Sequence, residues 1–327
     1  MRLGCGAQVL GKPGLHSYDG RRGQHAPHLS VSLVYLRAVL HYLLEHEIRM
    51  YRMAAELVPY ATHPDYPQLH HQLDDCGNEL AELGQWVLQQ RMRLSFHAPA
   101  SVALATIMPE GVEQARLRLN VLAGVLDRMA LGPEAVVVVH MGGLVGGADA
   151  AIERWLRAWE TLPAATQARL ALEHDEHGAS LALVLRIHAA TGVPVVFDHL
   201  HWLLHNPEGY DLTQALDAAL ATWPPHVRPK AHFATPRTEL RAVLKSDGAT
   251  RRRRWLLAPP RSGHHSDFVH PWEFAHFVEV AGHCREFDVL LEAKASDVAV
   301  LRLRDDLTRY VPDVAQWLYD RRGNDEC

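Results

Sequence analysis

The sequence predicts an α/β fold, namely a (β/α)8 barrel formed by residues 1–327 as a single domain. Short β-rich runs alternate with long amphipathic segments along the chain, which is typical of β-α units repeated around a parallel sheet. There are eight such runs, and no Ser/Gly-rich linker or abrupt change of composition divides them. A hydrophobic content of 48% in 327 residues is sufficient for one large core.

The predicted strands are short runs rich in β-branched and aliphatic side chains. They are Arg2–Val9, Ile48–Met53, Arg93–His97, Ala135–His140, Arg169–Glu173, Pro194–Asp198, Pro229–Phe233 and Asp288–Glu292.

The predicted helices carry apolar residues at i, i+3, i+4 and i+7. They are Ser32–Glu47, Gln72–Gln90, Gly111–Ala130, Asp149–Glu160, Leu181–Ala190, Leu212–Thr222 and Pro271–Gly282. The Pro-, Arg- and Gly-rich stretch 235–267 predicts a long irregular loop after the seventh strand, and 297–327 predicts a C-terminal helix with a tail.

Composition restricts the class of protein. The apolar stretches are far shorter than the roughly 20 residues of a membrane span, and the first ten residues lack the apolar region of a secretory signal. Four scattered cysteines indicate neither a zinc knuckle nor a disulfide framework. We therefore expect a monomeric cytoplasmic protein without a membrane partner. The formal charge of −5 argues against binding to nucleic acid by bulk charge alone.

The 23 histidines are the compositional anomaly, and several of them stand at predicted strand ends together with carboxylates. In a parallel barrel the carboxyl ends of all strands meet on the face that carries the active site. The residues at these ends are His97, His140, Glu173, Asp198, His201, His232 and Glu292, and the loop histidines His63 and His265 extend the set.

One histidine at a strand end is usually a hydrogen-bonded structural residue. Nine imidazoles and carboxylates gathered on one rim would instead be poorly solvated without cations. This donor set without thiolates suits Mn, Zn or Fe, and it exceeds the needs of one ion. The sequence thus predicts a multinuclear site of two or three divalent metal ions, with Glu173 from the middle strand as the bridge. Such sites activate water and stabilise phosphodiester displacement.

Lys230 lies two residues before His232 on one strand, so both side chains point to the same face. Its role is either a salt-bridged rim residue, a cation near the scissile phosphate, or a carboxylated lysine near the metals. The basic run Arg251, Arg252, Arg253 and Arg254, followed by Trp255, is either a solvated loop or a contact to DNA phosphates.

The ordered motifs "SFHAP", "VHMGG", "LEHDE", "VPVVFDHLHW", "PKAHFAT", "GHHSD" and "LLEAK" resemble the ultraviolet damage endonuclease family, relatives of endonuclease IV. "RLG" and "YRMAAELVPYATHP" extend the resemblance over Arg2 to Lys294. It implies a (β/α)8 barrel whose divalent ions, manganese first with Zn, Fe or Mg as alternatives, nick damaged double-stranded DNA 5′ to a lesion. The family's ligand positions fall on the nine residues above, with His265 preferred to His264, and its active-site lysine falls on Lys230. The catalytic residues implied are Glu173, Lys230 and Asp198.

The chain departs from the family at the side chains that probe the duplex. Cys5 and Val9 stand where the family has Tyr and Asn, and Ala100 and Ser101 stand where it has Gln followed by an aromatic residue. Neither Ala nor Ser can fill the gap left by flipped nucleotides. Tyr18, Trp202 or Trp255 is then either a substitute probe or a packing residue. His174 replaces an Asn of the family and is expected to be an added ligand or to face solvent.

Two other functions remain open at this stage. One is a different metal enzyme on the same barrel, either a sugar isomerase or epimerase, or a small-phosphoester hydrolase. The other is a non-catalytic binding module, against which the complete set of ligand positions argues.

Overall fold

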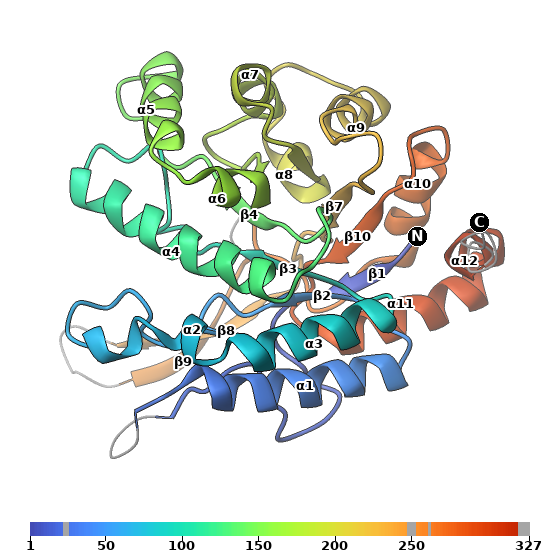
Figure 1. The fold of residues 1–327 in the computed structure, drawn as a ribbon. Helices are drawn as coiled ribbons and strands as arrows, with labels where there is room; N and C mark the ends of the chain where they lie inside the picture. Colours follow the sequence, from blue (N-terminus) through green and yellow to red (C-terminus); the bar gives the residue numbers. More distant parts are fainter. Residues whose placement is uncertain (22–25, 247–252, 261–262, 320–327) are drawn as a thin grey trace.

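The computed structural model describes residues 1–21, 26–246, 253–260 and 263–319, and its centre is a closed barrel of eight parallel strands (Figure 1). The barrel closes where β1 (Leu3–Cys5) pairs with both β2 (Met50–Met53) and β10 (Asp288–Leu291). The other strands are β3 (Arg93–His97), β4 (Val137–His140), β5 (Leu170–Glu173), β6 (Val195–Asp198) and β7 (Lys230–Phe233). Each predicted run contributes one strand, which confirms the predicted fold class.

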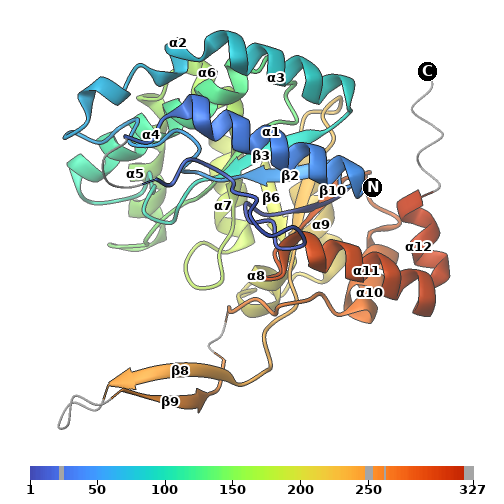
Figure 2. The ribbon, with the colours of Figure 1, turned by 90° about the horizontal axis from the view of Figure 1, so that it is seen from below.

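Helices surround the barrel and bury their apolar faces against it (Figures 1 and 2). They are α1 (Leu29–Glu45), α2 (Gln72–Asp75), α3 (Gly77–Gln89), α4 (Pro109–Arg128), α5 (Ala148–Glu160), α6 (Ala164–Arg169), α7 (Leu181–Thr191), α8 (His199–Leu204), α9 (Leu212–Ala221), α10 (Pro271–Ala281), α11 (Ser296–Tyr310) and α12 (Pro312–Tyr319). A 3-10 turn, Pro67–Leu69, precedes α2. None of these helices is long and apolar enough to cross a membrane.

The structure corrects several predicted boundaries. The helix predicted over Gln72–Gln90 is two helices, because the backbone of Cys76 leaves the helical region between α2 and α3. The C-terminal helix is likewise divided at Val311, which adopts an extended φ before Pro312. The first strand is three residues long instead of eight.

The sequence predicted an irregular loop over 235–267, but this stretch is only partly irregular. It contains an antiparallel hairpin of β8 (Arg241–Ser246) and β9 (Arg253–Ala258), which projects away from the barrel (Figure 2). Alternating Arg, Lys and aliphatic residues hid these strands, because the hairpin has no core beneath it to impose a recognisable apolar pattern.

The barrel interior is apolar on one side and charged on the other. On one side Val138, Ala171 and Val196 form an apolar cluster, to which β4, β5 and β6 contribute. On the other side the buried Arg93 Nη1 donates to Asp288 Oδ2 at 3.0 Å, at the end where the strands begin. This ion pair closes the barrel end opposite to the candidate site.

Candidate metal centre

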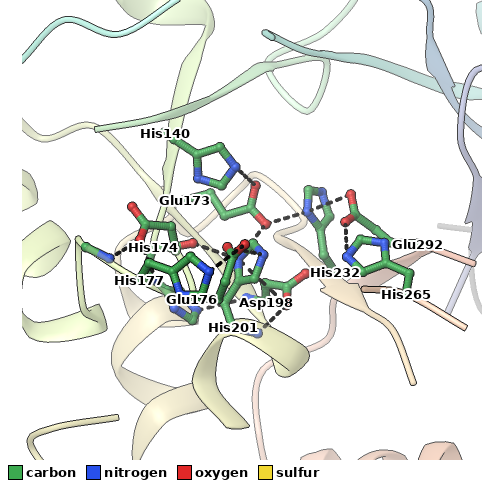
Figure 3. A network of polar contacts seen from close by, with 12 residues as sticks. His140, Glu173, His174, Glu176, His177, Asp198, His201, His232, His265 and Glu292 are labelled. Carbon is green, nitrogen blue, oxygen red and sulfur yellow. Dashed lines mark hydrogen bonds and ion pairs between the residues drawn. The ribbon is translucent and has the colours of Figure 1, made fainter. Parts of the chain in front are cut away.

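The predicted ligands from the strand ends meet at one end of the barrel. His97, His140, Glu173 and Asp198 are the last residues of β3, β4, β5 and β6, and Glu292 directly follows β10. All eight strands run in the same direction, so their carboxyl ends lie on the same face. Figure 3 shows His140, Glu173, Asp198 and Glu292 of this cluster together with their neighbours.

Glu173 lies at the centre of the cluster and is fully buried. Its Oε2 is 2.8 Å from His97 Nε2, and its Oε1 is 2.8 Å from His232 Nδ1. His140 Nε2 lies 3.8 Å from Oε2, and His201 Nδ1 lies 3.6 Å from Oε1. Burial alone would raise the pKa of Glu173, but the surrounding histidines outweigh it and hold this pKa well below the usual value. The carboxylate is therefore ionised and faces imidazoles on both sides.

Glu292 forms the second carboxylate of the cluster. Its Oε1 lies 3.6 Å from His232 Nδ1, and its Oε2 lies 3.6 Å from His265 Nε2. Arg52 forms a short ion pair with the same carboxylate. Burial opposes ionisation, yet Arg52 and His232 lower the pKa of Glu292 far below that of a free glutamate.

Asp198 and His201 form the third part of the cluster at the start of α8. The Asp198 side chain caps this helix by accepting from the His201 N–H at 2.8 Å. Burial acts to lower the pKa of His201, but Asp198 and Glu173 raise it to about 9. The His201 ring is thus held in a strongly negative environment, as expected beside a cation site.

The donor atoms fit divalent metal ions. Among the described residues, three groups place one ligand atom from each member within 4.8 Å of the others. They are His97, His140 and Glu173; His97, His232 and Glu292; and Glu173, Asp198 and His201.

Several buried polar atoms of this cluster also lack a hydrogen-bond partner in the described part of the chain, namely His232 Nε2, Asp198 Oδ2 and His140 Nδ1. Buried donors and acceptors left without partners are costly, and a cation at this cluster would be a partner for such atoms. The nitrogen and oxygen ligand set matches manganese, zinc or iron.

His63 and Tyr18 lie apart from these three groups. Both line a cleft of about 500 Å³ formed by the loops after β1, β2 and β3 together with α4, and Ser101 lines it too. The His63 ring packs edge-on against Tyr60 and Tyr66, and its Nδ1 accepts from the Asp65 N–H. The structure therefore does not bring His63 to the other predicted ligands, whereas His265 faces Glu292.

Lys230 is not a salt-bridged rim residue. Its side chain is fully buried one layer below His232, and its Nζ lies 3.2 Å from Ser95 Oγ. Burial, followed by the charges of Arg93 and Arg52, lowers the pKa of Lys230 well below the usual value. A neutral amine therefore lies directly beneath the candidate ligands.

The structure also shows the surroundings of three neighbouring side chains. His174 does not face solvent, because it is fully buried and its Nε2 accepts from the Asp198 N–H at 3.0 Å. Burial lowers the pKa of His174 to about 3, so the ring is neutral. Trp202 is half-buried and its Nε1 donates to the carbonyl of Tyr210, so it is a packing residue. Cys5 is fully buried, which raises its pKa to about 12.

The structure adds Arg52, which sequence reasoning missed, and shows the contact of the loop residue Glu176. Arg52 neutralises part of Glu292, and Glu176 Oε2 lies 3.4 Å from His201 Nε2 (Figure 3). A signal for Arg52 was present, because a charged side chain in a strand run needs a buried partner. Glu176 lies in a loop whose path is fixed by Asp175, which accepts from the N–H groups of residues 177 and 179.

Two of the predicted DNA-contacting residues, Arg254 and Trp255, lie on the described part of the hairpin. Arg254 is exposed on β9, and Trp255 beside it is 69% exposed. Arg251 and Arg252 lie outside the described residues, as does the side chain of Arg253.

Comparison with known proteins agrees with this geometry. The family model described as UV-endonuclease UvdE matches residues 28–317. A UV DNA damage endonuclease of Bacillus pumilus is 28% identical over 278 residues, which cover 85% of this chain and 80% of the relative. One from Bacillus cereus is 27% identical over 274 residues, 83% of this chain and 78% of the relative.

The solved structure of SacUVDE has the same fold, with a TM-score of 0.77 and 24% identity over 94% of this chain and 98% of that one. The match to the family model extends over nearly the whole barrel. The chain belongs to the UV-endonuclease UvdE family.

Proposed function

We propose that this protein is a DNA repair endonuclease that hydrolyses a phosphodiester 5′ to a lesion in double-stranded DNA and depends on divalent metal ions. The observation that carries the proposal is the buried cluster centred on Glu173, found in a chain of the UvdE family whose relatives are named UV DNA damage endonucleases. The proposed enzyme acts as a monomer.

Seven of the nine predicted ligands belong to the three groups around Glu173 and Glu292. We assign these seven, with His265 and His63, as ligands of two or three ions, manganese first. Glu173 belongs to two groups, which supports its role as the bridge. When bound, such ions supply activation of water and stabilisation of the attacking and leaving oxygens of a phosphodiester displacement. For His63 this assignment requires the loop after β2 to move toward the cluster when DNA or metal binds.

The chain's own residues hold this arrangement in place. The His174 carbonyl accepts from His201 Nδ1 at 2.8 Å, which fixes the orientation of the His201 ring beside Glu173 and Asp198. Asp198 fixes the first turn of α8 and keeps a second oxygen without a hydrogen bond. Arg52 holds Glu292 in its ionised form. These three contacts orient ligands before any metal arrives.

Lys230 has two candidate roles, as a cation near the scissile phosphate or as a carboxylated lysine. Its burial favours the second role, because only a neutral amine attacks the carbon of carbon dioxide, forming an N–C bond and releasing one proton. The resulting carbamate would add an oxygen ligand beneath the cluster.

The proposed substrate contacts are Arg254 and Trp255 on the hairpin, Tyr18 at the cleft, and Arg251, Arg252 and Arg253, which directly precede Arg254 in the sequence. The lesion range is a separate matter, because Ala100 and Ser101 are exposed, Ser101 at the cleft, and neither side chain is able to enter a base stack.

The sugar isomerase alternative is not favoured. A solved D-psicose 3-epimerase shares the fold, with a TM-score of 0.50, but only 11% of the sequence. That likeness shows the barrel alone.

A nicking assay on supercoiled plasmid tests the proposal. Purified protein with Mn²⁺ is expected to nick irradiated or abasic plasmid faster than undamaged plasmid, and EDTA is expected to stop the reaction. Absence of nicking on every substrate, with metal bound, would reject the proposed function. The Glu153→Gln variant, changed at an exposed glutamate on α5, is the matched control for variants of Glu173.

A further inference from the structure

The hairpin β8–β9 is a two-stranded ribbon that stands apart from the barrel. Its strands pair with each other in antiparallel register and with no other described strand. Figure 2 shows it projecting beyond the loops around α8. Six residues in each strand give a length of roughly 20 Å, equal to about six base pairs of duplex DNA. An isolated hairpin of this kind is marginally stable in water, so a partner is expected to cover it.

One face of the ribbon is apolar and exposed. Leu244 lies directly opposite Trp255, and Ala242 lies directly opposite Leu257, so these four side chains share a face. Leu244 is 45% exposed, Trp255 69% and Leu257 71%. An aromatic ring flanked by two leucines on a solvent-exposed face indicates a binding surface.

The other face carries two cations in a position that is unfavourable without an anion. Lys245 and Arg254 are direct cross-strand partners, and both are exposed. Like charges opposite each other destabilise a strand pair. Within the described residues neither side chain has an acidic partner at ion-pair distance. A phosphate between or beside them would remove this repulsion.

The charge of the segment identifies the class of partner. Residues 241–258 contain six basic side chains and one acidic side chain, a formal charge of +5, whereas the whole chain has a formal charge of −5. The remaining residues therefore sum to −10. Such local concentration of positive charge in an acidic protein is the electrostatic pattern of a polyanion contact.

The base of the hairpin is joined to the metal-binding end of the barrel. Pro236 and His265 form an antiparallel bridge, and the Arg237 N–H donates to the His264 carbonyl at 2.8 Å. Because His265 also faces Glu292, the segments that connect the ribbon to the barrel pass beside the candidate ligands. A DNA duplex whose backbone is held at the cluster would thus come into contact with the ribbon a few base pairs from the cut.

We propose that β8–β9 is a DNA-binding arm, an inference that rests on the proposed function because it takes duplex DNA as the substrate. Lys245 and Arg254 contact phosphates flanking the cut. Trp255, with Leu244 and Leu257, packs on base or sugar faces exposed at the lesion. The arm thereby supplies the aromatic contact that Ala100 and Ser101 lack. A two-stranded ribbon is narrow enough to lie in the major groove.

The experiment measures fluorescence anisotropy of a labelled duplex of about three helical turns, carrying one abasic-site analogue, with full-length protein in EDTA. Trp255→Ala is expected to weaken binding roughly ten-fold, as for the loss of one stacked base, with an unchanged salt dependence. Lys245→Ala with Arg254→Ala is expected to lower the slope of log K against log salt by about two. Circular dichroism is expected to show the fold of each variant unchanged.

Arg157→Ala with Arg302→Ala, at exposed cations on α5 and α11, controls for charge, and Leu88→Ala on α3 controls for exposed apolar area. The proposal of a DNA-binding arm would be contradicted if the hairpin variants bind DNA as tightly as the wild type, with an unchanged salt slope. A dimer seen in sedimentation that Trp255→Ala dissociates while DNA affinity stays constant would also contradict it. If the wild-type protein nicks no DNA but its DNA binding depends on the hairpin, the proposed function is rejected and the proposal of a DNA-binding arm stands.

Discussion

Glu173 is the single side chain on which most of the polar cluster converges, because two histidines lie within 2.8 Å of its two oxygens. A buried carboxylate holding several imidazoles in fixed positions is a rigid scaffold for cations. Its removal should therefore affect metal content before it affects the fold.

We predict that Glu173→Gln abolishes stable binding of at least one ion and lowers the nicking rate more than about 100-fold, since loss of an outer-shell partner alone costs up to that amount. Metal content by mass spectrometry and nicking of damaged plasmid measure the two effects. A Glu173→Gln protein with a full complement of metal and wild-type activity would contradict the bridging role. Glu153→Gln should behave as the wild type.

A second prediction concerns Lys230, a buried amine in contact with Ser95. Lys230→Met should leave the melting temperature unchanged or raise it, because an apolar side chain of similar length replaces a buried polar group. The same change should abolish nicking, because no amine or carbamate then lies below the cluster. Thermal unfolding and the plasmid assay provide the readouts, with Lys12→Met at an exposed lysine as control. Retained nicking would exclude Lys230 from the reaction.

At the scale of elements, α3 and the C-terminal end of α4 approach each other through Gly84. A Cβ at this position would lie 1.9 Å from the carbonyl oxygen of Met129, which belongs to the backbone and cannot rotate away. The two helices are therefore held at a spacing that only glycine permits.

We predict that Gly84→Ala destabilises the protein by about 1–3 kcal/mol, the usual cost of overpacking. Gly77→Ala at the start of the same helix is the matched control, since a Cβ there meets nothing within 4 Å. Urea unfolding followed by circular dichroism compares the two. Equal stability of both variants would show that α3 shifts freely, contrary to the packing described.

The elements that the sequence predicts well are those with a core behind them. The strands from β1 to β10 that form the barrel are mostly buried and rich in aliphatic residues, so their runs are visible without any structure. The hairpin β8–β9 has no such core, and its strands were hidden among charged residues. Breaks at Cys76 and Val311 depend on local backbone angles, which apolar periodicity does not report.

The same distinction holds for the site. Strand-end residues such as His140 and Asp198 could be predicted because barrel topology alone fixes where strands end. His63, Arg52 and Glu176 could not be placed, because loop paths and side-chain pairing depend on contacts between distant segments. The sequence thus indicates which residues reach the rim of the barrel. Which of them form ion pairs or hydrogen bonds with each other depends on the packing of the folded chain.

At the scale of the whole molecule, the two ends of the barrel have separate roles. The metal-binding end gathers histidines and carboxylates, and the opposite end holds Asp288 among Arg93, Arg2 and Arg228. Burial opposes ionisation of Asp288, but Arg93 and Arg2 outweigh it and lower the pKa of this carboxyl. A carboxyl whose pKa is lower in the folded state stabilises the fold above its unfolded pKa of about 4, and this contribution is lost as the pH falls through the folded value.

We predict that Asp288→Asn destabilises the protein by about 3–5 kcal/mol at pH 7, because it leaves the buried Arg93 without its ion-pair partner. The difference from the wild type should shrink as the pH is lowered below 4. Urea unfolding at a series of pH values measures it, with Asp149→Asn at a highly exposed aspartate as control. A difference that stays constant down to the lowest pH would contradict the role of the ionised carboxyl.

The closure of the barrel by β1 has a consequence for the order of folding. The Arg2 N–H donates to Asp288, a partner 286 residues away in the chain, and Gly4 fits between neighbouring strands where a side chain would collide with Met50. Contacts of such long sequence separation form late, since most of the chain must be collapsed before the two strands can meet. The ligands on β7 and after β10 reach their final positions relative to β3 only when this last seam is formed. Acquisition of metal should consequently be one of the final events of maturation, and a newly made chain passes through most of its assembly without the capacity to cut DNA.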